Sequence, residues 1–173
     1  MSDKINALAL AVRQSSPDEY PALAELFNKV HAGNPGLIQR SAADLSWRCQ
    51  NHPGMSPEGG LLVEDADGTL LGYAFVKDNG KILEFAVDQT DSYHQAAVLL
   101  IAACEDRARE SGADRLTVRT RGSDLQIDDV MREVGLIPTK AKSLMYASVV
   151  DPGALLDELL SSPEDPDLGC AFT

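Results

Sequence analysis

Apolar residues near the start of the chain recur at the spacing of helices. After a weakly alternating strand at residues 7–13, Ser16-Pro17-Asp18-Glu19 combines a capping residue, a proline at the first helical position and an acid three residues after the cap. This combination is typical of a helix start. Ser41-Ala42-Ala43-Asp44 repeats the signature and predicts a second, shorter helix. The first helix has one apolar face at i, i+3, i+4 and i+7 spacing: Tyr20, Leu23, Ala24, Phe27 and Val30.

Between residues 60 and 87 the apolar pattern changes to that of strands. Three apolar runs, at 61–63, 69–76 and 81–87, are separated by the turn sequences Asp65-Ala66-Asp67-Gly68 and Asp78-Asn79-Gly80. An Asp-Gly turn between apolar runs is a strong hairpin signal. We therefore predict three consecutive strands that form an antiparallel meander.

The next part of the chain is a predicted strand-helix-strand unit. A helix capped by Thr90 or Asp91 carries one apolar face, and a strand at 115–120 follows it. Strands joined in this way are parallel, with a right-handed crossover. A further helix, which Gly135 ends in the left-handed C′ position, and a strand at 143–150 complete the sheet.

The fold class predicted by these elements is α/β, with a mixed, mostly antiparallel central sheet and one parallel strand-helix-strand crossover. With 173 residues the chain is long enough for one domain, which we place at residues 1–150. Residues 151–173 contain a leucine-rich amphipathic helix and an acidic tail, which we expect to be disordered.

Charge and composition exclude several classes of function. With 15 Lys and Arg against 27 Asp and Glu, the acidic chain has a net charge of −12, so nucleic acid is not an expected partner. The longest apolar run, Ala96 to Cys104, is shorter than the ~20 residues of a membrane helix. The three cysteines form no CxxC pair and the three histidines are scattered, which predicts no metal site. The N-terminal segment is a poor secretory signal, so we expect a cytoplasmic protein.

Three segments in the second half of the chain match a known pattern. They are Glu84-Phe85-Ala86-Val87-Asp88 leading into an apolar helix, Ser111 to Val118, and Glu133-Val134-Gly135-Leu136 followed by a final strand. In order and spacing the chain resembles the GNAT superfamily of acyl-CoA-dependent N-acetyltransferases over about residues 7–150. The resemblance implies the GNAT-like acyl-CoA N-acyltransferase fold. It also implies an enzyme that transfers the acetyl group of acetyl-CoA to an amine of a small molecule or protein.

The resemblance places the cofactor, acetyl-CoA, at the start of the helix that follows residue 90. In the family a Q/R-x-x-G-x-G/A motif holds the pyrophosphate there, because glycines let a phosphate approach the backbone. The motif falls on Ser92-Tyr93-His94-Gln95-Ala96-Ala97, where only the last position agrees, so it is degenerate. A helix start favours a bound anion through its N–H groups and dipole; an ordinary capped helix start is the alternative. The resemblance also implies that main-chain N–H groups of Phe85, Ala86 and Val87 polarise the thioester carbonyl.

Glu84 is the candidate general base. It lies within an otherwise apolar strand, and burial favours the uncharged form of a carboxyl, which makes it a better proton acceptor. A solvent-facing edge position is the alternative for Glu84, and Asp88 is the second choice of base. The resemblance implies a Tyr that protonates the leaving thiolate, but Met131 occupies that position. Tyr146 or Tyr93 would then donate the proton, or the thiolate would leave unaided.

Two classes of function stay open at this point. As an enzyme, the acidic chain would attract a cationic amine acceptor by electrostatic steering. As a binding or scaffold module, it would keep the GNAT fold without binding CoA, which the missing glycines and the missing Tyr favour. A homodimer would cover the sheet edges and the leucine-rich last helix.

Two further features bear on the architecture. Trp47, beside Arg48 on the second predicted helix, either packs in the core or lines the acceptor cleft that the resemblance places there. From Asp151 to Leu156 the sequence resembles the start of the sterol-carrier-like domain that follows some GNAT domains. The chain would then be a relative of that two-domain family.

Overall fold

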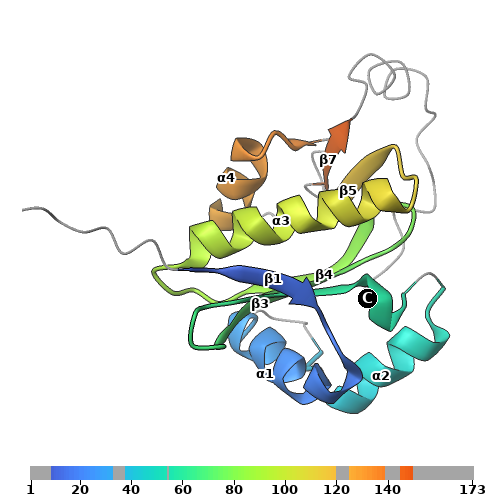
Figure 1. Ribbon diagram of the computed structural model, residues 1–173, viewed down its shortest axis with the longest axis vertical. Helices are drawn as coiled ribbons and strands as arrows, with labels where there is room; N and C mark the ends of the chain where they lie inside the picture. The colour runs from blue at the N-terminus through green and yellow to red at the C-terminus, as the bar shows by residue number, and fades with distance from the viewer. Residues whose placement is uncertain (1–8, 33–37, 54, 120–124, 139–144, 150–173) are drawn as a thin grey trace, which may run out of the picture.

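The computed structural model describes residues 9–32, 38–53, 55–119, 125–138 and 145–149. They form one sheet with helices on both of its faces (Figure 1). The sheet of the described residues has seven strands in the order β1-β2-β3-β4-β5-β7-β6. Their bounds are β1 Ala11–Gln14, β2 Gly60–Glu64, β3 Leu70–Val76, β4 Lys81–Val87, β5 Arg115–Arg119, β6 Ile137–Pro138 and β7 Met145–Val149.

Four α-helices connect the strands of the described part. They are α1 Tyr20–Val30, α2 Ala42–Asn51, α3 Tyr93–Glu110 and α4 Leu125–Glu133. Neighbouring strands are antiparallel except β4 and β5, which are parallel and joined through α3. This confirms the predicted fold class, a mixed and mostly antiparallel sheet with one parallel strand-helix-strand crossover.

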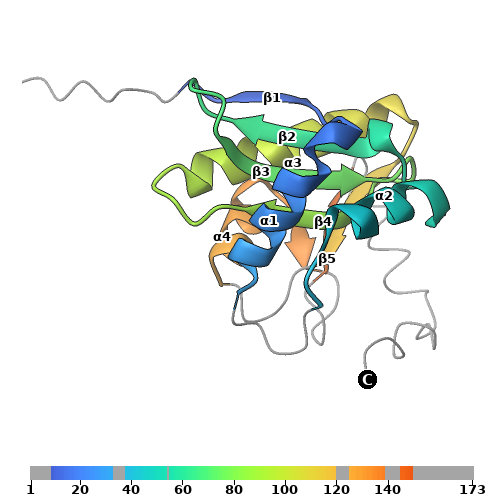
Figure 2. The same cartoon turned by 90° about the horizontal axis from the view of Figure 1, so that it is seen from below.

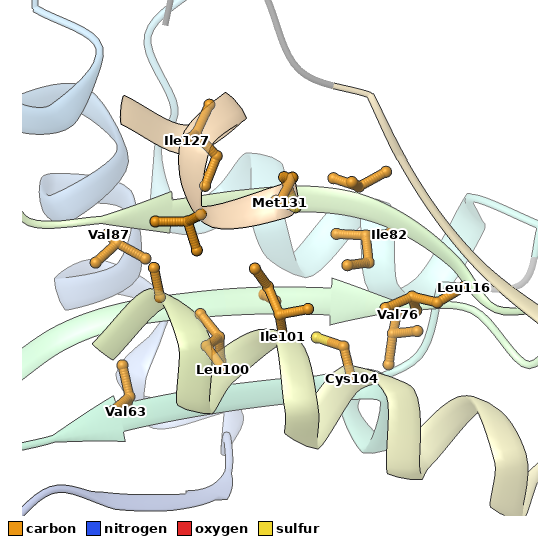
Figure 3. Packing of buried hydrophobic residues seen from close by; sticks show 14 of the residues in the cluster. Val63, Val76, Ile82, Val87, Leu100, Ile101, Cys104, Leu116, Ile127 and Met131 are labelled. Atoms are coloured by element: carbon orange, nitrogen blue, oxygen red, sulfur yellow. The ribbon is translucent and has the colours of Figure 1, made fainter. Parts of the chain in front are cut away.

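The helices divide between the two faces of the sheet. α3 and α4 cover one face, and α1 and α2 cover the other (Figure 1, Figure 2). Each face has its own cluster of buried apolar side chains. In the cluster beneath α3 and α4, Leu100, Ile101 and Met131 pack with strand residues such as Val87 (Figure 3). Burial of both faces of the central strands stabilises the sheet.

The starts of α1 and α2 follow the predicted capping signatures. The Ser41 hydroxyl accepts a hydrogen bond from the Asp44 N–H (3.1 Å), and the Asp44 carboxylate accepts one from the Ser41 N–H (2.9 Å). This reciprocal pair is a capping box. The first predicted helix begins with a 3₁₀ turn at Pro17–Glu19, so that α1 itself starts at Tyr20.

The start of α3 differs from the prediction. Thr90 and Asp91 do not cap the helix, because the Thr90 carbonyl accepts from the Tyr93 N–H (2.9 Å) in a turn that precedes it. Ser92 takes the N-cap position, and its carbonyl accepts from the Ala96 N–H (2.9 Å). The predicted cap residues, Thr90 and Asp91, thus belong to the turn, and the helix begins one residue later than predicted.

The end of the domain contains one element that periodicity missed. Gly135 has a φ of +85° and lies two residues after the end of α4, as predicted for a left-handed C′ residue. The strand β6 comes two residues later and pairs with β7, but two residues are too few to show an alternating pattern. The predicted helix and acidic tail at 151–173 lie outside the described residues.

A β-bulge interrupts the middle of β4. Three residues of β4, from Ile82 to Glu84, lie opposite only two of β3. Side chains alternate along a regular strand, but Leu83 and Glu84 both face α1 and α2. Ile82 and Phe85, on either side of them, pack against the cluster beneath α3. The bulge therefore turns a carboxylate toward the α1 and α2 side without disturbing the apolar face beneath α3.

The parallel contact between β4 and β5 is short. In the described residues Lys81 lies beside Thr117 and Ile82 beside Val118, and the pairing ends there. Gly80 leads into this junction with a φ of +77°, and its carbonyl accepts from the Thr117 N–H (2.8 Å). Beyond the junction, the described residues show β4 paired with β3.

Gly80→Ala should destabilise the fold more than Gly112→Ala. Both glycines have similar φ values, +77° and +79°, at which alanine costs about 1–2 kcal/mol. A Cβ at Gly80 would lie 1.9 Å from the Arg115 carbonyl oxygen, whereas at Gly112 no described atom beyond its chain neighbours lies within 4 Å. Overpacking should add about 1–3 kcal/mol to the loss at Gly80. Chemical denaturation measures the free energy of unfolding of both variants. Equal losses would mean that the contact between Gly80 and Arg115 can relax to accept a Cβ.

Candidate functional site

Glu84 is buried at the bulge of β4 and bound by three side chains. Its carboxylate is only 2% exposed. The oxygen Oε1 accepts from Arg40 Nε (3.1 Å) and from Arg48 Nη1, while Oε2 accepts from the Tyr73 hydroxyl (3.1 Å). The solvent-facing alternative for Glu84 is therefore wrong. The polar surroundings also differ from the apolar environment that the sequence suggested.

Arg40 is held in place by residues of α1. The Asn28 side chain donates to the Arg40 carbonyl (2.8 Å) and accepts from the Arg40 N–H (2.7 Å). The guanidinium carbon of Arg40 lies 4.9 Å from the centre of the Phe27 ring, within the range of a cation–π interaction. These contacts fix both the backbone and the head group of Arg40 before any ligand is present.

The buried cluster shifts the pKa of its neighbours. Burial, followed by the negative charge of Glu84, raises the pKa of Tyr73, so this hydroxyl stays protonated and donates to the carboxylate. Burial also raises the pKa of the nearby Cys49 thiol, which argues against a reactive thiolate. Hydrogen bonds from Ser41, and then the charges of the two arginines, lower the pKa of Asp44. Asp44 is therefore an exposed anion that caps α2.

Strand β4 presents main-chain groups on the side facing away from β3. The Asp88 N–H donates to the Leu71 carbonyl (2.7 Å) of β3. Because main-chain groups in an antiparallel pair alternate in direction, those of Phe85 and Val87 point the other way, and those of Ala86 point toward β3. Within the described residues β5 does not pair with β4 at this level. Among the described residues, no strand pairs with the N–H groups of Phe85 and Val87.

The segment Ser92-Tyr93-His94-Gln95-Ala96-Ala97 forms the N-cap and first turn of α3. The Ala96 N–H makes the first intrahelical bond, to Ser92, so the N–H groups of His94 and Gln95 have no acceptor within the helix. Both of these side chains are exposed, and His94 Nε2 lies 2.7 Å from a Glu133 carboxylate oxygen at the end of α4. Ala96 and Ala97 are fully buried, and Tyr93 packs partly against the core.

The other predicted site residues are dispersed. Met131 is fully buried and faces the core, so it belongs to the packing of α4. Asp88 pairs with Lys29 (2.6 Å) on α1. The main chain of Tyr146 on β7 lies beside Val118 of β5, while its side chain lies outside the described part of the structure.

Trp47 is not a core residue. Its side chain is 62% exposed on α2, next in sequence to an arginine of the buried cluster. The exposure excludes core packing, and the alternative, that Trp47 lines an acceptor cleft, stays a prediction. In the described residues no group of three or more His, Cys, Asp and Glu side chains could hold a metal ion. No helix among the described residues is long and apolar enough to span a bilayer.

Sequence reasoning missed the two arginines around Glu84. Asp44 and Arg48 have the i, i+4 spacing of a helix-surface ion pair, which suggests that both side chains are in solvent. In the structure Asp44 caps α2 and Arg48 reaches Glu84 on β4. The signal that could have found the pairing is Glu84 itself, because a buried carboxylate requires a cationic partner.

Solved structures that resemble this chain are acetyltransferases. No protein-family model matches the sequence, and no match is found among the curated proteins. Among solved structures, an N-acetyltransferase from Staphylococcus aureus matches with a TM-score of 0.65 at 13% identity, over 82% of this chain and 99% of that one. An acetyltransferase of the GNAT family from Streptococcus pneumoniae gives 0.61 at 12% identity, over 82% and 99%.

A third solved structure contains a ligand. It is the PaiA N-acetyltransferase from Thermoplasma acidophilum in complex with coenzyme A, with a TM-score of 0.59 at 14% identity, over 82% of this chain and 99% of that one. At these identities the likeness concerns the fold. The chain therefore has the fold of GNAT N-acetyltransferases, as its sequence predicted.

Glu84→Gln should destabilise the protein far more than Glu133→Gln. The first substitution leaves Arg40 and Arg48, which are 17% and 30% exposed, without their carboxylate, and breaking a buried pair costs about 3 kcal/mol. Glu133 pairs with His94 in an exposed position, where an ion pair contributes at most about 1 kcal/mol. Urea denaturation at neutral pH measures both. Similar losses would mean that the cluster around Glu84 adds nothing to stability.

Proposed function

We propose that this chain is an N-acetyltransferase that uses acetyl-CoA and acts on an amine. The observation that carries the proposal is that, among the described residues, β5 pairs with β4 only at Lys81 and Ile82, while the main-chain N–H groups of Phe85 and Val87 point away from β3. These donors precede the first turn of α3 in a fold shared with solved acetyltransferases, one of them in complex with coenzyme A. Main-chain donors of this kind suit a carbonyl oxygen on which negative charge develops.

The chemistry requires an acceptor amine beside β4. Acetyl-CoA supplies an activated acetyl group. The amine nitrogen forms a bond to the acetyl carbon, the carbon–sulfur bond of the thioester breaks, and the proton lost by the nitrogen balances the one gained by the leaving thiolate. The N–H groups of Phe85 and Val87 would stabilise the carbonyl oxygen during this exchange.

The first turn of α3 would hold the pyrophosphate of acetyl-CoA. The N–H groups of His94 and Gln95 lack an acceptor within the helix, and the helix dipole adds to their attraction for an anion. The contribution of Ala96 and Ala97 is restricted to the main chain, because both side chains are buried in the core. The Gln95 side chain is exposed, so it can move aside where the family has a glycine.

Proton transfer would involve other groups than Glu84. Three donors already occupy the two oxygens of that carboxylate, which leaves it poorly placed to accept a proton from the amine. Asp88 is tied to Lys29. Tyr93 and Tyr146 remain the candidate donors to the leaving thiolate.

A second candidate, a GNAT-fold binding or scaffold module without CoA, is favoured by the packing around α4. Ile127 and Met131 share one buried cluster with Val87 of β4 (Figure 3). His94 at the start of α3 also pairs with Glu133 at the end of α4. These contacts hold α4 against β4 and the start of α3, where the proposed cofactor would bind. A module that binds no CoA would have no need to open this region.

Acetyl-CoA should bind and stabilise the purified protein. Calorimetric titration is expected to show saturable binding at micromolar concentrations. At about 100 times the Kd, the ligand should raise the free energy of unfolding by about 2.7 kcal/mol, which a rise in Tm would report. Absence of both heat and a Tm shift at millimolar acetyl-CoA would favour the module without CoA.

Gln95→Glu should weaken binding of acetyl-CoA about fivefold without loss of stability. The new carboxylate lies in the first turn of α3, where the dipole favours an anion by about 0.3–1 kcal/mol, but it repels pyrophosphate by about 1 kcal/mol. Gln50→Glu on α2 is the matched control, because it makes the same charge change on an exposed residue of another helix. Titration with acetyl-CoA measures the affinity of both variants. Equal affinities of Gln95→Glu and Gln50→Glu would mean that the pyrophosphate does not bind at the first turn of α3.

A further inference from the structure

We infer that Arg40 and Arg48 bind a carboxylate of the acceptor, so that the acceptors are free amino acids. The inference rests on the proposed acetyl transfer and specifies its substrate class. It starts from the cluster around Glu84, where two guanidinium groups contact the same carboxylate oxygen. Nothing in the acidic composition of the chain predicts a local excess of positive charge.

The first argument is the charge of the cluster. One arginine would neutralise Glu84, and the Tyr73 hydroxyl donates to its second oxygen. The second arginine leaves the contacting groups with a net charge of +1 on side chains that are 17% and 30% exposed. Because the two guanidinium groups share one carboxylate oxygen, this surplus positive charge is only partly balanced. An anionic ligand would offset the remaining cost of burying it.

Among the described residues, Asp44 is a second acid near these arginines. It is within electrostatic range of both, since their charges contribute to its lowered pKa. Its carboxylate, however, accepts from the Ser41 N–H (2.9 Å) and the Ser41 hydroxyl (2.8 Å). Asp44 therefore moderates the positive potential from a distance without occupying the guanidinium donors.

The second argument is the number of donors that remain. A guanidinium has five N–H groups in a planar fork that matches a carboxylate. Glu84 engages one nitrogen of each arginine. In the described residues the terminal nitrogens of Arg40 and the remaining nitrogens of Arg48 are not engaged by Glu84, and the two side chains are 17% and 30% exposed.

The third argument is preorganisation. Asn28 binds the backbone of Arg40, Phe27 lies against its guanidinium, and Glu84 anchors both head groups. A site that is fixed before binding loses less entropy when the ligand arrives. Glu84 is then a positioning residue for the arginines.

The fourth argument is location. Glu84 is adjacent to Phe85 on β4, and one strand residue spans about 3.4 Å. The carboxylate and amine of an α-amino acid are separated by a single carbon. A carboxylate held by the arginines would therefore place its amine on the α1 and α2 side of β4, at the level of Glu84 and Phe85. Two exposed hydrophobic residues, Ile38 and Trp47, also lie within two positions of the arginines in sequence.

The test begins with binding in the absence of CoA. Each proteinogenic L-amino acid is titrated by calorimetry and by the fluorescence of Trp47, the one tryptophan of the chain, which precedes Arg48. The amino acid that binds best is then compared with the amine that lacks only its carboxylate. We expect the amino acid to bind about tenfold more tightly or better, as for a charge-assisted pair. Equal binding of the two would overturn the inference.

Arg48→Gln removes the surplus charge and leaves Glu84 paired with Arg40 and Tyr73, so the fold should persist. The variant should lose the preference for the amino acid, with a KM about tenfold higher and a smaller change in kcat. Its KM for the matched amine should not change. Arg48→Lys keeps the charge and should restore part of the affinity. Arg109→Gln, an exposed residue of α3 paired with Glu105 and Asp106, is the control with the same charge change.

The outcomes separate this inference from the proposed function. Binding of acetyl-CoA together with no preference for amino acids over amines overturns the carboxylate site and leaves acetyl transfer intact. Binding of amino acids that Arg48→Gln abolishes supports the site, even where acetyl-CoA does not bind and acetyl transfer fails. An unchanged preference in Arg48→Gln overturns the site, whatever acetyl-CoA does.

Discussion

The burial of the Glu84 carboxylate constrains the side of the sheet that α1 and α2 cover. A carboxylate in this position must be compensated by donors and positive charge. The compensation comes from three separate segments: Tyr73 on β3, Arg48 on α2 and Arg40 before it. One ionised group thus fixes the position of α2, the chain that leads into it and, through Asn28, the helix α1. The apolar cluster beneath α1 and α2 packs around this polar centre.

Much of the fold could be predicted from the sequence because its signals are local. Capping residues, Asp-Gly turns and apolar periodicity depend on neighbours within a few positions, and the helices and most strands followed them. The failures are cases in which a local signal was ambiguous or too short. Before α3, neighbouring residues of the capping type made the first residue of the helix ambiguous, and a turn at Thr90 decides it. The strand β6 has two residues, which are too few to show an alternating pattern.

The candidate site could be predicted only in part because its chemistry depends on distant contacts. Sequence reasoning selected Glu84 as unusual, since an acid within an apolar strand requires an explanation. It could not predict that the partners would be arginines 44 and 36 residues away. The resemblance implied main-chain donors at Phe85, Ala86 and Val87. The register directs the N–H groups of Phe85 and Val87 away from β3, but that of Ala86 toward it, so Ala86 does not fit that role.

The bulge in β4 has a consequence for how the strand can evolve. A regular strand assigns odd and even positions to opposite layers, so a change of one residue in length would exchange the two sets of side chains. The additional residue, Leu83, separates β4 into two segments with opposite phase. The segment before it stays locked to β5, and the segment after it carries Glu84 and the exposed main chain of Phe85. Substitutions that adapt the charged layer can therefore accumulate on one segment while the other retains its registry with the rest of the sheet.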